Sequence, residues 1–194
     1  MIKYALKVFS FIKIRYPENN FGLSFYIYPF ICSLLISALI VWSQTSTASN
    51  NFIVLFLMPE FDSITTFIQV LPGFYIGALA AISSFQRDGM DNKLPTPTPY
   101  LIECVENGER KIELSRRTYL TLMFAYLASM TIILAISIFF LKLFYALKVF
   151  EVPEFLFTSI YAFNTFIIFF FFFQTIVITF VGIYYLGNRM HRNI

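Results

Sequence analysis

The residue types that most often do chemistry, carboxylates and cations, gather in one stretch of this chain, residues 86–117. Paired carboxylates can serve as general acid and base or hold a metal ion. Six of the 11 Asp and Glu residues lie there: Asp88, Asp91, Glu103, Glu106, Glu109 and Glu113. The same stretch holds six Lys and Arg residues. This matched count favours a solvated mixed-charge surface over a catalytic one.

The sequence contains few residues that could bind a metal ion or act as a catalytic nucleophile. Cys32 lies in an apolar run and Cys104 in a polar loop, so the two are expected at different depths and too far apart to bridge. His191 is the only histidine, and no Cys-x-x-Cys occurs. Phosphate-binding Gly loops, nucleophile elbows and His-Glu-x-x-His are also absent from the sequence. We therefore expect no enzyme activity, no catalytic residue, no metal and no cofactor.

The fold class follows from hydropathy. Hydrophobic residues make up 58% of the chain and charged residues 13%, which is typical of a membrane protein. A helix needs about twenty apolar residues to cross the bilayer. Four runs meet this length: Phe21 to Trp42, Ser63 to Phe85, Tyr119 to Leu141, and a span within Phe155 to Leu186. The prediction is an all-α integral membrane protein with four transmembrane helices and a small cytoplasmic β-hairpin between helices 2 and 3.

This prediction divides the chain into four segments. Residues 1–20 form a basic amphipathic segment, and residues 21–85 hold helices 1 and 2 with an outer interfacial segment. Residues 86–117 form the hairpin loop, and residues 118–194 hold helices 3 and 4 with a short tail.

The distribution of Lys and Arg predicts the orientation. Twelve of the 14 fall on one side of the predicted spans, and only Lys142 and Lys148 lie elsewhere. Positive loops resist translocation, so both termini and the hairpin loop are expected in the cytoplasm. The net charge of +3 is not concentrated in a basic stripe, so direct nucleic-acid binding is not expected.

Residues 100–114 carry a strong hairpin signal. Asn107-Gly108 lies between two alternating runs and predicts a two-residue turn. A lone hairpin is marginally stable in water, so it needs a partner: the membrane surface, a neighbouring subunit or another protein. The turn predicts one face made of Leu101, Glu103, Val105, Arg110, Ile112 and Leu114. The residues expected to dock a partner are Val105, Arg110, Lys111, Ile112, Arg116 and Arg117.

Two apolar segments are too short to span and are expected to rest in the outer leaflet. They are residues 52–58 and 143–150. Their predicted interfacial residues are Phe52, Leu55, Phe56, Phe144, Leu147 and Phe150. At the other side of the membrane, residues 1–16 predict a basic amphipathic helix on the inner leaflet, with Ile12 on its apolar stripe.

Four further residues are candidates for helix packing. Gly73, Gly77 and Ala81 recur at intervals of four and predict a close-approach face, either within one subunit or between subunits. Gln174 is the most central polar residue of the apolar runs. It is expected to form an interhelical hydrogen bond worth on the order of 1 kcal/mol, with a polar constriction at a subunit axis as the alternative. Acids, bases and histidine are absent from the depth of every run, which argues against an ion pump or proton-coupled carrier.

The whole-chain pattern resembles KwaA, the membrane component of the Kiwa anti-phage defence system. The shared features are the chain length, the basic N-terminal stretch, the four spans, and the lead from Pro95 to Pro99 into one hairpin before Ser115. The resemblance implies a bacterial inner-membrane sensor that assembles as a homo-oligomer, with a tetramer as the expected form. It also implies a cytoplasmic DNA-binding effector similar to KwaB. The competing interpretations are a small multi-pass channel or transporter subunit, or a scaffold without a sensing role.

Overall fold

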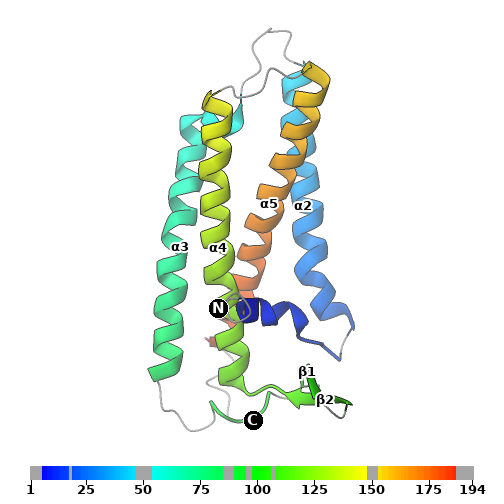
Figure 1. The fold of residues 1–194 in the computed structure, drawn as a ribbon, viewed down its shortest axis with the longest axis vertical. Coiled ribbons are helices and arrows are strands. Elements are labelled where there is room, and N and C mark those ends of the chain that lie inside the picture. The colour runs from blue at the N-terminus through cyan, green and yellow to red at the C-terminus, as the bar shows by residue number, and fades with distance from the viewer. Residues whose placement is uncertain are drawn as a thin grey trace. The chain divides into compact units, whose positions relative to one another are not determined.

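The computed structural model describes residues 6–17, 19–46, 54–84, 90–94, 98–105, 108–147 and 153–186. Four long helices dominate the described chain (Figure 1): α2 (Asn19–Ser46), α3 (Pro59–Ser84), α4 (Arg116–Leu147) and α5 (Glu154–Tyr184). Each contains a stretch that is long and apolar enough to cross a membrane: Gly22–Ser43, Pro59–Ser84, Arg116–Leu147 and Phe155–Tyr184. A two-stranded antiparallel sheet, β1 (Tyr100–Val105) and β2 (Gly108–Glu113), lies between α3 and α4 in the chain. The predicted fold class is confirmed, and the cytoplasmic location of the hairpin stays a prediction.

The chain folds into two compact units. The first, which we call the hairpin unit, comprises Met1–Phe25, Pro72–Ser129 and Val177–Ile194. The second unit comprises Tyr26–Leu71 and Met130–Ile176. Each long helix contributes residues to both units.

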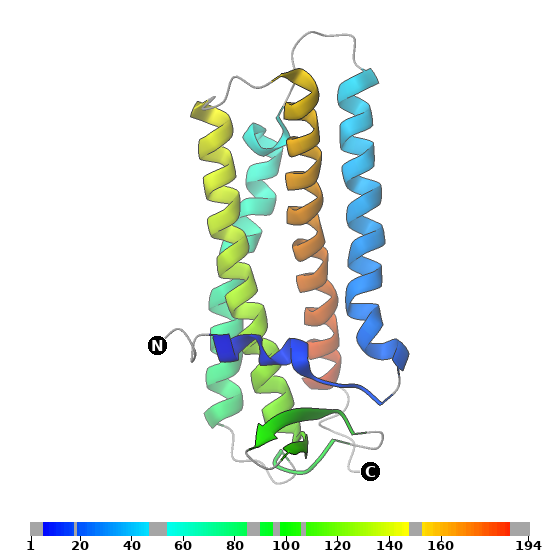
Figure 2. The ribbon, with the colours of Figure 1, turned by 45° about the vertical axis from the view of Figure 1, so that its right-hand side comes forward.

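The second unit has a core rich in aromatic residues. Phe30 of α2 packs edge-on against Phe166 of α5, with ring centroids 5.5 Å apart. Accordingly, α2 lies beside α5 in both ribbon views (Figures 1 and 2). The buried cluster of this unit comprises Phe56, Phe61, Ile68, Leu134, Ile138, Tyr161, Ile168 and Phe169.

The N-terminal segment differs from the predicted amphipathic helix. Residues Leu6–Lys13 form a 3₁₀ helix, η1, which has three residues per turn instead of 3.6. Phe11 in η1 and Ile14 just after it are buried three residues apart, and the N–H of Ile14 donates to the carbonyl of Phe11 at 3.2 Å. Ile12, which was expected on the apolar stripe, is 51% exposed. The prediction failed because the stripe was drawn with the period of an α-helix.

Two helix boundaries also differ from the prediction. Helix α3 begins at Pro59, four residues earlier than expected. Proline is well tolerated at the first helical position, and Glu60 and Asp62 in the first turn suit the positive end of the helix dipole. Helix α4 continues through Leu147, so part of the predicted outer interfacial segment is the last turns of a span.

Candidate functional site

The hairpin faces match the prediction, although the turn does not. The register pairs Val105 with Gly108, one residue out of step with the predicted turn, and Glu106 and Asn107 lie outside the described residues. The predicted turn at Asn107-Gly108 would have placed Glu106 opposite Glu109. The observed register instead places Glu103 opposite Arg110 and Leu101 opposite Ile112. Like charges directly opposite each other are unfavourable, so the predicted register carried a pairing of two glutamates that the observed register does not have.

The hairpin is joined at one edge by the N-terminal segment. The backbone N–H of Arg15 donates to the carbonyl of Tyr100 at 2.9 Å, and the N–H of Tyr100 donates to the carbonyl of Arg15 at 3.1 Å. These two bonds form an isolated antiparallel bridge on β1. An edge strand has unpaired backbone groups, and the bridge satisfies part of that edge from within the chain.

The residues before the hairpin pair with those after it. Leu94 donates its N–H to the carbonyl of Leu114 at 3.1 Å, and Leu114 donates to the carbonyl of Pro99 at 3.1 Å. Leu94 and Leu114 are both buried. The hairpin, which is too small to stand alone, thus gains backbone partners from the chain itself. Docking of another protein on the hairpin stays a prediction.

Helix η1 connects this sheet to the long helices of the hairpin unit. Phe11 stacks on Tyr126 of α4 with ring centroids 5.4 Å apart, and it lies 6.2 Å from the ring of Phe25 in α2. Tyr16 and Tyr119 share a hydrogen bond of 3.2 Å between their hydroxyl groups. Figure 2 shows η1 crossing the first half of α4. The same short segment therefore contacts two long helices and the edge of the sheet.

Arg117 has partners that offset its unfavourable position in the first turn of α4. A cation at the N-terminus of a helix opposes the helix dipole. In the structure, Nε of Arg117 lies 2.8 Å from the Asp91 carboxylate, and Nη1 donates to the carbonyl of Ile82 at 3.4 Å. That carbonyl lies in the last turn of α3, where a cation is favourable. Arg117 therefore links α3 to α4.

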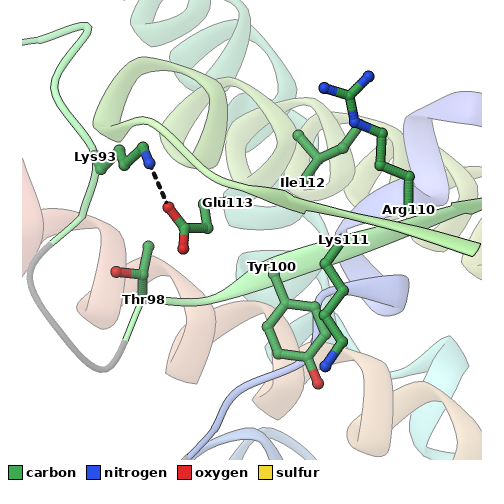
Figure 3. Close-up of a pocket in the computed structure, with 7 residues that line it drawn as sticks. All are labelled: Lys93, Thr98, Tyr100, Arg110, Lys111, Ile112 and Glu113. Carbon is green, nitrogen blue, oxygen red and sulfur yellow. Dashed lines mark ion pairs between the residues drawn. The ribbon is translucent and has the colours of Figure 1, made fainter.

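The other predicted docking residues are arranged on two faces. Arg110 and Ile112 project from one face of the hairpin, and Lys111 lies beside the Tyr100 ring on the other (Figure 3). Arg110 and Lys111 are exposed, whereas Ile112 and Arg116 are half-buried. The Val105 side chain lies outside the described part of the structure.

The small-residue face of α3 points outward. A Cβ atom added to Gly73 or Gly77 would meet nothing within 4 Å, and both glycines and Ala81 are exposed. Packing of this face inside one subunit was one of two expected uses, and the structure contradicts it. Contact between subunits stays a prediction.

The close approach of helices occurs at Gly182 instead. A Cβ atom there would lie 2.7 Å from Cε of Met123 and 3.3 Å from Cζ of Phe124. Helix α5 therefore packs onto α4 at a position that only glycine fits without movement. Sequence reasoning missed it because Gly182 has no small residue four positions away to mark a stripe.

Gln174, predicted to pack between helices, is 3% exposed. This burial agrees with a packing role, and a position at a subunit axis stays untested. Among the described residues, no group of three or more His, Cys, Asp or Glu is placed to hold a metal ion.

The predicted outer-leaflet residues divide into two kinds. Phe144 and Leu147 are 48% and 62% exposed, so they are available to lipid. Phe56 is fully buried, so its expected place in the leaflet was wrong, and Leu55 is half-buried with its N–H donating to the Tyr161 hydroxyl at 3.1 Å. The physical reason is that the 3₁₀ turn η2 (Leu55–Leu57) directs Phe56 into the aromatic core. Phe52 and Phe150 lie outside the described residues.

One of the two cations outside the basic segments has a structural partner. Lys142 of α4 forms an ion pair with Asp62 in the first turn of α3, and its Nζ lies 5.7 Å from the centre of the Phe61 ring. The positive-inside rule counts Lys and Arg residues and gives little weight to carboxylates, so Lys142 stays an exception to the predicted orientation.

No protein-family model, curated protein or solved structure matches this chain. The fold itself defines the class. The chain is a multi-pass helical membrane protein whose only described sheet belongs to a unit that also contains the N-terminal segment.

Proposed function

We propose that this chain is a sensor and scaffold of the bacterial inner membrane, which responds to perturbation of the bilayer during phage infection and recruits a cytoplasmic effector. The resemblance to KwaA supports this proposal. On this view the effector, a KwaB-like DNA-binding protein, carries the chemistry, and the present chain carries none. The chain would act as a homo-oligomer with both termini in the cytoplasm.

One observation supports the proposal most directly. The N-terminal segment contacts α2 and α4 through Phe11 of η1, and it contacts the sheet through the bridge between Arg15, just after η1, and Tyr100. A basic segment at the membrane surface responds to the lipid around it. Displacement of η1 would therefore be passed to the hairpin, where an effector would dock. Phage-plating assays of cells with this gene and its neighbour, with either alone and with neither, test the function. Protection by this gene alone would contradict a recruiting role.

The proposed orientation predicts the location of reporter fusions. Twelve of the 14 cations would lie inside, which strongly disfavours the inverted arrangement. Fusions of alkaline phosphatase at Asn50 and Phe155 should be active, since that enzyme folds only outside the cytoplasm. Fusions after Asp91 and Ile194 should be inactive. A cytoplasmic signal at Asn50 would refute the arrangement.

If the hairpin recruits an effector, substituting Ile112 should weaken the binding of that effector. A buried apolar anchor contributes about 2 kcal/mol or more to an interface, so Ile112→Asp should reduce co-purification of the neighbouring gene product roughly thirty-fold or more. Lys111→Glu should weaken it only at low salt, because exposed charges mainly affect association rate.

Ile112→Val is the matched control, because it keeps a β-branched apolar residue opposite Leu101. All variants should insert and remain monodisperse, since none lies in a span. Full recovery of the partner with a correctly inserted Ile112→Asp protein would move the docking site away from the hairpin.

A further inference from the structure

A groove lies along the hairpin beside Lys93 and Thr98, which precede β1 in the chain. Its volume is about 420 Å³, and it is open to solvent on one side. Two lysines and one carboxylate lie on the groove side of the hairpin, so the groove carries a positive excess even without Arg110. The lining residues are Lys93, Thr98, Tyr100, Arg110, Lys111, Ile112 and Glu113 (Figure 3).

The two lysines of this groove are held only weakly by their present partners. Lys93 lies 2.6 Å from the Glu113 carboxylate, with side chains 72% and 51% exposed. Exposed ion pairs of this kind contribute little. The Nζ atom of Lys111 lies 5.2 Å from the centre of the Tyr100 ring. Both ammonium groups can therefore turn toward an anionic ligand at low cost. Arg110 projects from the opposite face, so it adds to the field without direct contact (Figure 3).

The position of the groove indicates where such an anion comes from. Glu113 lies three residues before Arg116, the first residue of a candidate span. Three extended residues reach about 10 Å at most, and each headgroup layer of a bilayer is roughly 5–7 Å thick. The groove is therefore within reach of the lipid headgroups that surround the N-terminus of α4.

The size and polarity of the groove suit a headgroup better than a bare ion. Each water occupies about 30 Å³ in the liquid, so the space far exceeds one small anion. Enclosed small-molecule sites are mostly apolar, whereas this one is open and charged. A lipid would place its polar headgroup here and leave its chains in the bilayer.

We propose that this groove binds the phosphate-bearing headgroup of an anionic membrane lipid, with Lys93 and Lys111 as its direct ligands. The phosphate would replace Glu113 as the partner of Lys93. Bound lipid would then connect Lys93 and, through Lys111, strand β2 to the membrane. This inference does not depend on an effector.

The test compares two variants that each remove two positive charges from the hairpin unit. Lys93→Gln with Lys111→Gln removes the proposed ligands. Arg189→Gln with Arg192→Gln removes two cations near the C-terminus, neither of which is among the lining residues of the groove. Phosphatidylglycerol is titrated into the full-length protein in neutral detergent, and bound lipid is counted by native mass spectrometry.

The groove variant should bind phosphatidylglycerol roughly thirty-fold more weakly, which corresponds to about 1 kcal/mol for each lysine. The control variant should lose less than about threefold. Equal losses in both variants would show diffuse attraction and overturn the site, as would no loss in either. Glycerol 3-phosphate is added in a separate arm. If it displaces the lipid at equal concentration, a soluble phosphate is the ligand and the lipid assignment fails. Loss of partner recruitment with lipid binding unchanged would assign the groove to a protein instead.

Discussion

Replacing Phe56 by alanine is expected to lower the free energy of unfolding by about 3–5 kcal/mol. Phe56 is fully buried, and its ring packs against three aromatic neighbours. The ring centroids lie 5.2 Å from Phe61, 5.7 Å from Tyr145 and 5.9 Å from Tyr161. The substitution removes these contacts and leaves a cavity among residues of three segments. Thermal unfolding of the purified protein in mild detergent, followed by loss of monodisperse protein, measures the effect.

Leu57 supplies the matched control for Phe56. It follows Phe56 in the same 3₁₀ turn but is 48% exposed. Leu57→Ala should change stability by no more than about 0.5 kcal/mol, as surface substitutions usually do. If both variants lose the same stability, the turn is not anchored through Phe56. Phe56→Leu should recover part of the loss because it refills some of the cavity.

Introducing leucine at Gly182 is the second change with a large expected effect. The first added atom would already lie 2.7 Å from Met123, which is itself fully buried. Overpacking of this kind typically costs 1–3 kcal/mol and can cost more. We expect Gly182→Leu to lower the midpoint of thermal unfolding and to separate α5 from α4 in the hairpin unit. Gly182→Ala should cost less, because the flexible end of Met123 can move.

Two comparisons isolate the cause of the Gly182 effect. Gly182→Leu with Met123→Ala should be more stable than the sum of the single variants predicts, since the second change makes room for the first. Gly77→Leu adds the same side chain where nothing lies within 4 Å, so it should leave the protomer folded. If the outward face of α3 joins subunits, Gly77→Leu will instead lower the mass of the assembly. A full-mass assembly with Gly77→Leu would exclude that face as a subunit contact.

The local features of this protein were predictable from its sequence, because they depend on short-range patterns. Four apolar runs of sufficient length determine four helices whatever packs around them. Alternation in residues 100–114 determined which side chains share a hairpin face. The turn was misplaced by one residue because the prediction relied on the local Asn107-Gly108 signal and gave no weight to which residues would then lie opposite each other across the strands.

Features that join distant segments could not be predicted. An apolar run of seven residues ending at Met58 gives no sign that Phe56 turns inward, because its ring partners lie in α3, α4 and α5. Likewise, the bridge from Arg15 to Tyr100 leaves no mark in either local sequence. The proposed docking surface and lipid groove depend on these long-range contacts more than on any motif.

The Arg15–Tyr100 bridge also has a consequence for the order of biosynthesis. Arg15 leaves the ribosome 85 residues before Tyr100, and translation adds about 5–20 residues per second, so its partner is missing for roughly 4–17 s. Tyr126, on which Phe11 stacks, is made later still. During this interval the basic, partly apolar N-terminal segment has neither of these partners. Its apolar side chains can then be buried at the membrane surface. The segment therefore reaches its final position only after α2 and α3 have been synthesised. Because the hairpin unit also includes residues from Val177 onward, it is complete only after α5 has been made.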